Sequence, residues 1–361
     1  MKQMKKISVV LLALVMSLAL ASCSDKGKSA GKSGDTKTIV FIPKITGNAF
    51  FESANDGAQA HAKANGYTVQ YVGSQQASVT EQIRFIRQAI AQGADGISVS
   101  SLDVTALDAV MKDAIKAGLA VTTWDSDVSG DARAVMVSQG TPDILGKMLV
   151  DMGADALKNR GKNPGNDVIK YVWHYSQPTV ADQNSWHAAG EAYVKQKYPK
   201  WVNVRTDNYY SNQDPEQALS VGQAILQSHN DIDLIICNDS TALPGQLQAA
   251  QNLGKNKNDV TITGFAPPNS IKPFARADVV ERWGLWDSGQ QGALGCYLAF
   301  YIASGNEVTV GSKINVPSIG TVEVFPNTVL DPGAYTSPNS GVVLLPERVV
   351  FTLDNMDKYN F

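Results

Sequence analysis

Apolar runs of strand length alternate with amphipathic helical segments along most of this chain, and no other feature of the sequence restricts its fold as strongly. The run TIVFIP at residues 38–43 is almost continuously apolar, which is typical of a strand covered on both faces. Ile83, Ile86 and Ile90 then repeat at helical spacing, and Gly93 follows as a helix stop. Strands that alternate with helices of this length predict parallel sheets with right-handed crossover connections.

The alternation occurs in two successive sets. The strands of the first set are predicted at residues 38–43, 67–72, 97–100 and 119–124. The pattern restarts after Thr141, and the strands of the second set are predicted at residues 168–173, 202–207, 234–237 and 260–265. Two such sets predict an α/β fold with two Rossmann-like, doubly wound parallel-sheet lobes.

The two lobes are predicted to share the C-terminal part of the chain. We expect the N-terminal lobe to comprise residues 38–141 plus about 288–345, and the C-terminal lobe residues 142–287 plus about 346–361. From Gly289 onward a single helix is followed by β-like and loop-rich segments, and we interpret this region as chain crossing back between the lobes. With 361 residues, the chain is long enough for each lobe to have its own core.

The N-terminus has the parts of an export signal. Met1–Lys6 is basic, residues 7–20 form an apolar run too short to span a bilayer comfortably, and the letters LASC that end at Cys23 resemble a bacterial lipobox. We therefore predict a signal peptide over residues 1–22 and lipidation of Cys23. Residues 23–37 are rich in Lys, Ser and Gly and are predicted to form a flexible tether. The alternatives are an uncleaved membrane anchor and a plain signal peptide with a chance cysteine.

The charge balance argues against a nucleic-acid partner. The chain has 31 basic and 34 acidic side chains, and three of the basic ones lie in the predicted signal peptide, so the exported protein is acidic. A phosphate backbone requires clustered Lys and Arg. We expect an exported lipoprotein of the cell surface or periplasm, which is a monomer and contacts the membrane through its lipid anchor.

Cys237 and Cys296 follow the signal region. The first ends a predicted strand, the second lies in a predicted helix, and neither has the CxxC spacing of a metal or redox site. We expect two buried free thiols. A disulfide stays open as the alternative, since it depends on geometry.

Polar residues follow most of the predicted strands, and ligands of open α/β sheets bind beyond the carboxyl ends of the strands. These polar positions are Lys44, Asp125, Asp127 and the segments 177–184, 238–242 and 266–269. Carboxylates accept hydrogen bonds from hydroxyl groups, whereas Lys44 and amide groups donate them. Because each hydroxyl of a polyol both donates and accepts, this mixed set predicts a site for a small polyhydroxylated molecule.

Each candidate side chain also has a purely structural interpretation. A strand-end Asp often caps a helix, which applies to Asp125 and more strongly to Asp182, because Asp182 opens a predicted helix. For Lys44 the alternative is a solvated surface charge. Four aromatic residues are candidates to pack on the apolar face of a sugar-like ring, and core packing is the alternative for the tryptophans. They are Phe50, Phe51, Trp124 and Trp286.

Signals for catalytic or metal chemistry are weak. No GxSxG turn, P-loop or GxGxxG follows a predicted strand, and Asp125 and Asp127 alone are a weak signal for acid–base work. No metal-spaced pair occurs among the histidines, which are His61, His174, His187 and His229. We therefore expect no catalytic residue, no metal and no cofactor, and we do not expect an enzyme.

Several motifs together resemble those of the type I periplasmic sugar-binding protein family, and within it the autoinducer-2-binding proteins of Lsr ABC transporters. The resemblance runs from about Ile39 to Phe361. The matching segments are FIPK (41–44), TWDSD (123–127), QGTP (139–142), PTVADQN (178–184), GLWD (284–287) and LLPERV (344–349). Any one of these motifs is weak evidence, but together they are specific.

The resemblance implies two Rossmann-like lobes joined by a three-strand hinge, with the ligand in the cleft between them. It implies a solute-binding protein for uptake of autoinducer-2, a quorum-sensing signal, in its hydrated and unborated furanose form. The implied partners are the membrane subunits of the ABC transporter. The family's ligand-binding positions correspond here to Lys44, Asp125, Asp182 and Gln183.

One binding segment departs from the family's pattern, which reads PDANALP. Here the segment is NDSTALP at residues 238–244, so Asn238 and Ser240 replace the Pro and Ala whose groups touch the ligand. If those contacts are main-chain carbonyls, the same ligand fits; if not, the added amide and hydroxyl change which polyol fits. A pentose or a deoxyhexose is therefore the alternative ligand for the same fold, and a lipid-anchored enzyme acting on a sugar is the alternative class.

Overall fold

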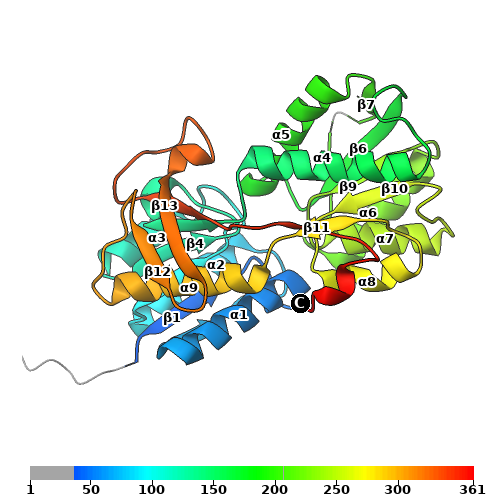
Figure 1. Cartoon of the computed structure of the whole chain (residues 1–361). Coiled ribbons are helices and arrows are strands. Elements are labelled where there is room, and N and C mark those ends of the chain that lie inside the picture. The colour runs from blue at the N-terminus through cyan, green and yellow to red at the C-terminus, as the bar shows by residue number, and fades with distance from the viewer. Residues whose placement is uncertain (1–35, 206) are drawn as a thin grey trace, which may run out of the picture. The chain divides into compact units, whose positions relative to one another are not determined.

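The computed structural model describes residues 36–205 and 207–361. The predicted signal peptide, Cys23 and nearly all of the predicted tether lie outside these residues. No helix in the described part of the chain is long and apolar enough to cross a membrane. Two mostly parallel sheets alternate with helices along the chain (Figure 1), which confirms the predicted α/β fold class.

The larger sheet and its helices form what we call the N-terminal lobe. Its strands are β1 (Thr38–Ile42), β2 (Thr68–Tyr71), β3 (Gly96–Val99), β4 (Ala120–Trp124), β5 (Val135–Ser138), β12 (Lys313–Val316), β13 (Gly320–Pro326) and β14 (Gly341–Leu344). Their order is β12-β13-β14-β5-β4-β3-β1-β2. The six strands from β14 to β2 in this order pair in parallel, whereas β12 and β13 run antiparallel at one edge.

The smaller sheet and its helices form the C-terminal lobe. Its strands are β6 (Ile169–Tyr175), β7 (Trp201–Asn203), β8 (Tyr209–Tyr210), β9 (Leu234–Cys237) and β10 (Thr261–Gly264). Their order is β10-β9-β6-β7, and β8 pairs with the end of β6. All of these pairings are parallel, as the continuous apolar runs predict.

Three connections run between the lobes. The first leads from β5 to helix α4 (Pro142–Asn159), the second from β11 (Trp283–Leu285) to α9 (Ser288–Ala303), and the third from β14 to β15 (Val349–Phe351). Strands β11 and β15 pair antiparallel, and Figure 1 shows β11 and the red C-terminal segment running between the two groups of elements. These connections form the predicted three-strand hinge. The predicted lobe bounds stay a prediction, since pairing alone does not fix where a lobe ends.

Helices cover both faces of each sheet. The N-terminal lobe has α1 (Ala49–Asn65), α2 (Val79–Gln92), α3 (Asp108–Lys116) and α9. The C-terminal lobe has α4, α5 (Ala181–Lys197), α6 (Pro215–Ser228), α7 (Ala242–Asn252) and α8 (Pro268–Arg276). Short 3₁₀ turns are η1 (Gly130–Ala132), η2 (Asn327–Val329) and η3 (Met356–Lys358). Helix α1 begins where the Asn48 side chain accepts from the Phe50 N–H, and it ends at Gly66 in the left-handed conformation.

Both faces of the N-terminal sheet are buried, which explains the uninterrupted apolar run of its first strand. Successive residues of a strand point to opposite faces. Ile39 and Phe41 belong to one core cluster, whereas Val40 and Ile42 belong to a second cluster that includes Ile86 of α2. A strand with only one buried face would show polar residues at every second position.

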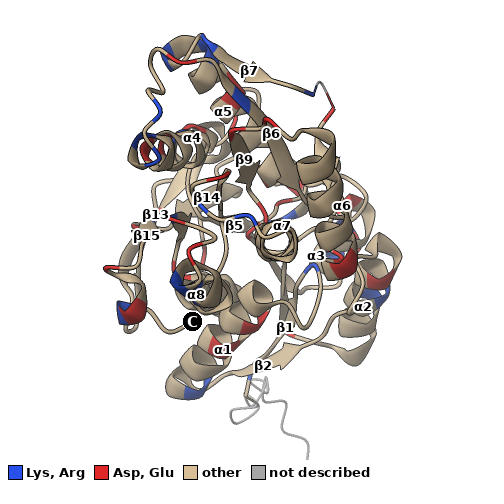
Figure 2. Ribbon diagram, turned by 90° about the vertical axis from the view of Figure 1, so that its right-hand side faces the viewer, with Lys and Arg blue, Asp and Glu red and all other residues tan. Residues whose placement is uncertain are grey.

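Charged residues are interspersed rather than segregated by sign. In the view of Figure 2, basic and acidic positions lie close together on helices such as α2 and α4. Several form exposed ion pairs, for example Lys112 with Asp131 at 2.7 Å and Lys197 with Asp151 at 2.9 Å. Such exposed pairs contribute little to stability.

The structure differs from the predicted elements at several short segments. The predicted strand over residues 202–207 is too long, because β7 ends at Asn203 and β8 follows separately at Tyr209–Tyr210. The sequence pattern also predicts no strand at β5 or β11 and no helix at α8. These strands have two to four residues, which is too short for a period of two to be distinctive.

Cys237 and Cys296 are buried and free, which confirms the free-thiol expectation and excludes the disulfide alternative. Burial raises the pKa of both thiols well above the ordinary value. A thiol that stays protonated is a poor nucleophile, so both cysteines pack as small apolar residues.

Helices α1 and α9 approach each other through glycine, and this contact provides a test of the packing. A Cβ atom at Gly292 would lie 2.0 Å from the carbonyl oxygen of Ala54. Gly292→Ala should therefore lower the free energy of unfolding by about 1–3 kcal/mol, even though Ala is the better helix former. The control is Gly165→Ala, where the nearest atom to a Cβ lies 3.7 Å away. Urea unfolding that finds Gly292→Ala as stable as this control would contradict the close packing.

Candidate ligand-binding site

Side chains at the carboxyl ends of strands from both sheets meet at one place. In the N-terminal lobe, Lys44 follows β1, Ser100 follows β3 and Asp125 follows β4, and these strands are neighbours in the sheet. In the C-terminal lobe, Ser176 follows β6 and Asn238 follows β9, which are also neighbours. Parallel strands end at a common edge, so residues distant in sequence come together there.

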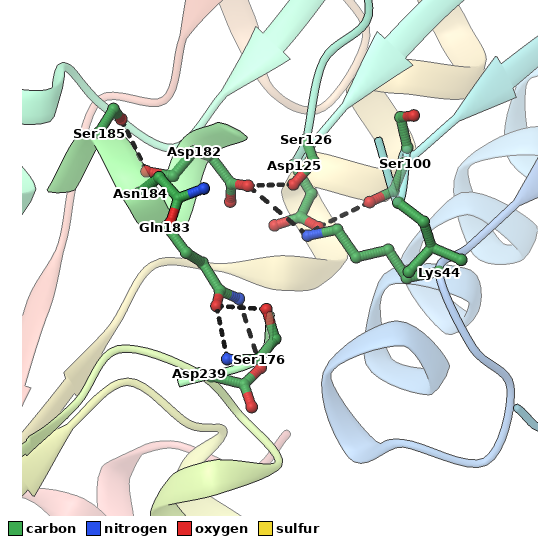
Figure 3. Close-up of polar contacts among 12 residues, drawn as sticks. Lys44, Ser100, Asp125, Ser126, Ser176, Asp182, Gln183, Asn184, Ser185 and Asp239 are labelled. Carbon is green, nitrogen blue, oxygen red and sulfur yellow. Dashed lines mark hydrogen bonds and ion pairs between the residues drawn. The ribbon is translucent and has the colours of Figure 1, made fainter. Parts of the chain in front are cut away.

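Lys44 is buried between two carboxylates that belong to different lobes. Its side chain is 2 % exposed, and its Nζ lies 2.9 Å from Oδ2 of Asp125 and 3.7 Å from Oδ1 of Asp182 (Figure 3). Ser100 donates from Oγ to the same oxygen of Asp125 at 2.7 Å. The surface-charge interpretation of Lys44 is therefore wrong, and so is the helix-cap interpretation of Asp125. Asp125 has a left-handed φ of 61°, a conformation that few residues other than Gly, Asn and Asp adopt.

Asp182 lies in the first turn of α5 but does not cap it. The N-cap residue is Val180, which makes no side-chain cap bond. The Asp182 carboxylate instead accepts hydrogen bonds from Oγ of Ser126 and, at 3.3 Å, from Nε2 of Gln139. Ser126 and Gln139 follow β4 and β5, so the N-terminal lobe holds this carboxylate of the C-terminal lobe. The cap interpretation of Asp182 is wrong.

The buried charges are unequal in number, and this shifts their pKa values. Burial acts to lower the pKa of Lys44, but the attraction of Asp125 and Asp182 outweighs it, so the pKa is raised. The pKa of Asp182 is raised to about 6, because burial together with the charge of Asp125 outweighs the attraction of Lys44. Burial also raises the pKa of Asp239, although the hydrogen bond from the Ala242 N–H and the charge of Lys44 act to lower it. Three carboxyl groups thus face one ammonium group, and this excess of acceptors suits a hydroxyl donor and opposes an anion.

Gln183 is fixed from both sides of its amide. Its Oε1 accepts from the Ser176 N–H at 3.1 Å and from Oγ of Ser176 at 2.7 Å, while its Nε2 donates to Oδ1 of Asp239 at 3.3 Å (Figure 3). Asn238 donates from Nδ2 to the main-chain oxygen of Gln183 at 2.9 Å. These bonds give the Gln183 side chain a single orientation.

Ser240 contacts the other lobe. Its Oγ donates to Oδ1 of Asn48 at 3.2 Å, and Nδ2 of Asn48 donates to Oγ1 of Thr241 at 3.1 Å. Asn48 is also the N-cap residue of α1. The first turn of α1, which carries Phe50, is therefore tied to the start of α7.

These side chains surround about 330 Å³ of empty space. Three aromatic rings pack edge to face against Trp286, at centroid distances of 5.8 Å for Phe50, 5.8 Å for Trp186 and 5.5 Å for Phe265. The cavity is lined by Lys44, Phe50, Phe51, Asp125, Gln183, Trp186, Gln213, Asn238, Asp239, Ser240, Phe265, Leu285 and Trp286. Its walls combine an aromatic group with buried polar side chains from both lobes.

Several sequence candidates lie outside this lining. Asp182 lies beside the cavity and borders a second hollow of about 1100 Å³. Asp127 also borders that hollow, where it binds Nη2 of Arg133 at 2.5 Å, so its role is structural. Trp124 is fully buried and stacks on Phe41 at 4.5 Å, which supports its core interpretation. The predicted segment 266–269 does not contribute to the lining, although Phe265 before it does.

Sequence reasoning missed several lining residues. Phe265 is the last residue of a predicted strand that ends one residue earlier, at Gly264. Trp186 lies three residues after Gln183 on α5, so the two side chains share one face of the helix, and this spacing could have identified Trp186. Gln213 follows β8, and the rule that ligands bind beyond strand ends would have found it if β8 had been recognised.

The arrangement is suited to hold hydroxyl groups. Lys44 and amide nitrogens donate, carboxylates accept, and aromatic rings offer an apolar surface. Among residues 36–205 and 207–361, no group of three or more His, Cys, Asp or Glu side chains is placed to hold a metal ion.

Comparison with known proteins identifies relatives of this chain. A family model described as a periplasmic binding protein domain matches residues 39–307. The chain is 61 % identical to LsrB from Clostridium saccharobutylicum, solved in complex with AI-2; that match covers 90 % of this chain and 100 % of the other, with a TM-score of 0.89.

More distant relatives also bind sugars according to their descriptions. The D-ribose/D-allose-binding protein of Pseudomonas aeruginosa is 24 % identical over 308 residues, which is 82 % of this chain and 91 % of that protein. An ABC transporter solute-binding protein from Burkholderia graminis, solved with D-arabinose, shares the fold with a TM-score of 0.72 at 20 % identity, covering 91 % of this chain and 100 % of the other. On the family match and the LsrB identity, the chain belongs to the periplasmic binding protein family, in its sugar-binding type I class.

Proposed function

We propose that this protein is the solute-binding subunit of an ABC transporter and that it binds autoinducer-2, in its hydrated and unborated furanose form, for uptake. The observation that carries the proposal is the small, acceptor-rich cavity whose lining comes from both lobes. The 61 % identity to LsrB, a protein solved with AI-2, supports the choice of ligand.

The proposed contacts follow from the chemistry of the lining. Lys44 donates to a ligand oxygen, and Asp125 accepts from ligand hydroxyl groups. Gln183, Asn238 and Ser240 contact the ligand from the C-terminal lobe, and the rings of Phe50 and Trp286 cover its apolar edge. Asp182 acts at the edge of the cavity, where its distance of 3.7 Å from Lys44 Nζ leaves room for a shared hydroxyl group. We expect an uncharged polyol to bind better than a phosphorylated one, because the carboxylates repel anions.

Binding is proposed to stabilise the form in which the lobes are in contact. Lys44 and Asp125 belong to one lobe and Gln183 and Asn238 to the other, so a ligand that touches all four favours closure. A dissociation constant of 1 μM corresponds to about 8 kcal/mol. Several charge-assisted hydrogen bonds of roughly 1.5–3 kcal/mol each contribute toward this value, against the cost of ordering the ligand and the lobes.

A pentose or a deoxyhexose is the second candidate ligand. The feature that favours it is the pair Asn238 and Ser240, which brings an amide and a hydroxyl group to the wall of the cavity. Either ligand, autoinducer-2 or such a sugar, fits a transport function, because the family binds solutes without changing them chemically.

The N-terminal sequence extends the proposal to the protein's location. Because the family is periplasmic, the chain is exported, and we propose that Cys23 is lipidated and holds a monomer near the transporter's membrane subunits. Cys23→Ser should release the protein from the membrane fraction into the soluble exported fraction, because it removes the acylated thiol. Fractionation with immunoblotting checks this, and a variant that stays in the membrane fraction would contradict lipidation.

Calorimetry on the purified protein tests the ligand. We expect autoinducer-2 to bind at least about tenfold more tightly than D-ribose, D-arabinose or L-rhamnose, and to be recovered unchanged after long incubation. Asp125→Asn and Asp182→Asn should each weaken binding by roughly 10- to 100-fold, since each removes a charged acceptor. The control is Asp131→Asn, an exposed carboxylate paired with Lys112. Unchanged affinity in both site variants would remove these residues from the site, and tighter binding of a sugar would replace the ligand.

The raised pKa of Asp182 predicts a pH dependence of stability. The folded protein keeps this proton up to about pH 6, whereas the unfolded chain loses it near pH 3.8, so stability falls as the pH rises through that interval. Asp182→Asn does not titrate, and every other group is common to both proteins. The unfolding free energy of the wild type relative to the variant should therefore fall from pH 4 to 7 by about 1.4 kcal/mol per unit of pKa shift. Urea unfolding would contradict this prediction if the unfolding free energies of the wild type and the variant differed by a constant amount across this pH range.

A further inference from the structure

Gln213 is a buried side chain whose amide nitrogen has no protein partner. The residue is 4 % exposed and lines the cavity that also borders Lys44 and Asp125. Among residues 36–205 and 207–361, no atom accepts a hydrogen bond from its Nε2, which is fully shielded from solvent. Buried polar groups in proteins are almost always paired, so this donor requires an explanation.

The position of Gln213 is fixed by its own loop. The Ser211 N–H donates to the main-chain oxygen of Tyr175 at 2.8 Å, and the Asn212 N–H donates to that of Ser176 at 2.7 Å. Oγ of Ser211 donates to Oδ2 of Asp239 at 3.1 Å. Asn212 and Gln213 both have left-handed φ angles, of 51° and 57°. Gln is not among the residues that tolerate this conformation well, so the loop holds the amide at the cavity wall against a local backbone penalty.

Asn238, which also lines the cavity, carries the complementary group. Its Nδ2 is committed to the main-chain oxygen of Gln183, which fixes the orientation of the amide. Its Oδ1 is buried and accepts no hydrogen bond from any described residue, and Asn238 is 1 % exposed. Among the fully buried lining atoms of the described residues, Nε2 of Gln213 is thus a donor without a protein partner and Oδ1 of Asn238 is an acceptor without one.

A hydroxyl group is the chemical group that satisfies both atoms at once. Its oxygen accepts a hydrogen bond while its hydrogen is donated to another atom. We infer that Gln213 and Asn238 together bind one hydroxyl group of the ligand, and that this pair makes the site selective for a ring polyol that carries a hydroxyl group facing the C-terminal lobe. The inference deepens the proposed function and rests on it for the identity of the ligand.

An apolar residue at position 213 would be the better choice for packing alone. A buried amide without a partner destabilises a protein, and an apolar side chain of similar size is neutral or stabilising in its place. Gln213→Leu should therefore unfold at the same temperature as the ligand-free wild type or higher. The same variant should bind autoinducer-2 at least about fivefold more weakly, because a ligand hydroxyl group loses its donor on entering the cavity.

The matched control is Asn212→Leu. It places the same apolar side chain in the same left-handed loop, but residue 212 is exposed and does not line the cavity. Its affinity should stay within twofold of the wild type. If Gln213→Leu also stays within twofold, Gln213 does not contact the ligand and the inference is wrong; if both variants lose affinity equally, the effect comes from the loop, and the inference is again wrong.

A double-mutant cycle tests whether the pair shares one hydroxyl group. In an Asn238→Ala background, Gln213→Leu should weaken binding by a smaller factor than in the wild type, since the hydroxyl group is already poorly held. If Gln213→Leu weakens binding by the same factor in both backgrounds, the two residues bind different groups. If the wild type binds D-ribose, D-arabinose or L-rhamnose but not autoinducer-2, the proposed ligand fails while the same cycle with that sugar still decides the inference. A wild type that binds none of them overturns both.

Discussion

The structure depends on one constraint, which is that Lys44 is buried together with more negative charge than it can neutralise. Ion pairs removed from water are stable only when their remaining donors and acceptors are satisfied. Ser100 satisfies Asp125 from within the N-terminal lobe, but the second carboxylate, Asp182, arrives from the other lobe and is held there by Ser126. The cluster is therefore complete only when the lobes are in contact.

The same excess of acceptors explains what kind of molecule suits the cavity. The carboxyl groups offer more lone pairs than the protein's own donors fill, so hydroxyl groups are favoured and anions are opposed. The aromatic wall around Trp286 has no such preference and contributes by removing apolar surface from water. Polarity thus selects the chemical class of the ligand.

Much of the site followed from the sequence because parallel strands end at a common edge. Lys44, Asp125 and Asn238 could be predicted from apolar runs and the polar residue after each. What the sequence could not reveal depends on contacts between distant segments. Strand β5 has four residues, too few for a distinctive period, and it pairs with β14, about 200 residues away. The partners of Asp182 come from the other lobe, which is why its position in a helix suggested a cap. Gln213 was missed because the two-residue strand β8 before it carries no periodic signal.

The two departures from the family's binding segment have different physical consequences. Asn238 uses its Nδ2 to hold the main chain of Gln183, so the amide that replaces a proline orients a neighbouring cavity residue within one lobe. Ser240 uses its hydroxyl on Asn48 of the opposite lobe, so it adds a hydrogen bond that exists only when the lobes touch. The first change bears on which polyol fits, because it leaves Oδ1 at the wall of the cavity. The second bears on how readily the lobes close, since a cross-lobe bond stabilises the closed form whether or not a ligand is bound.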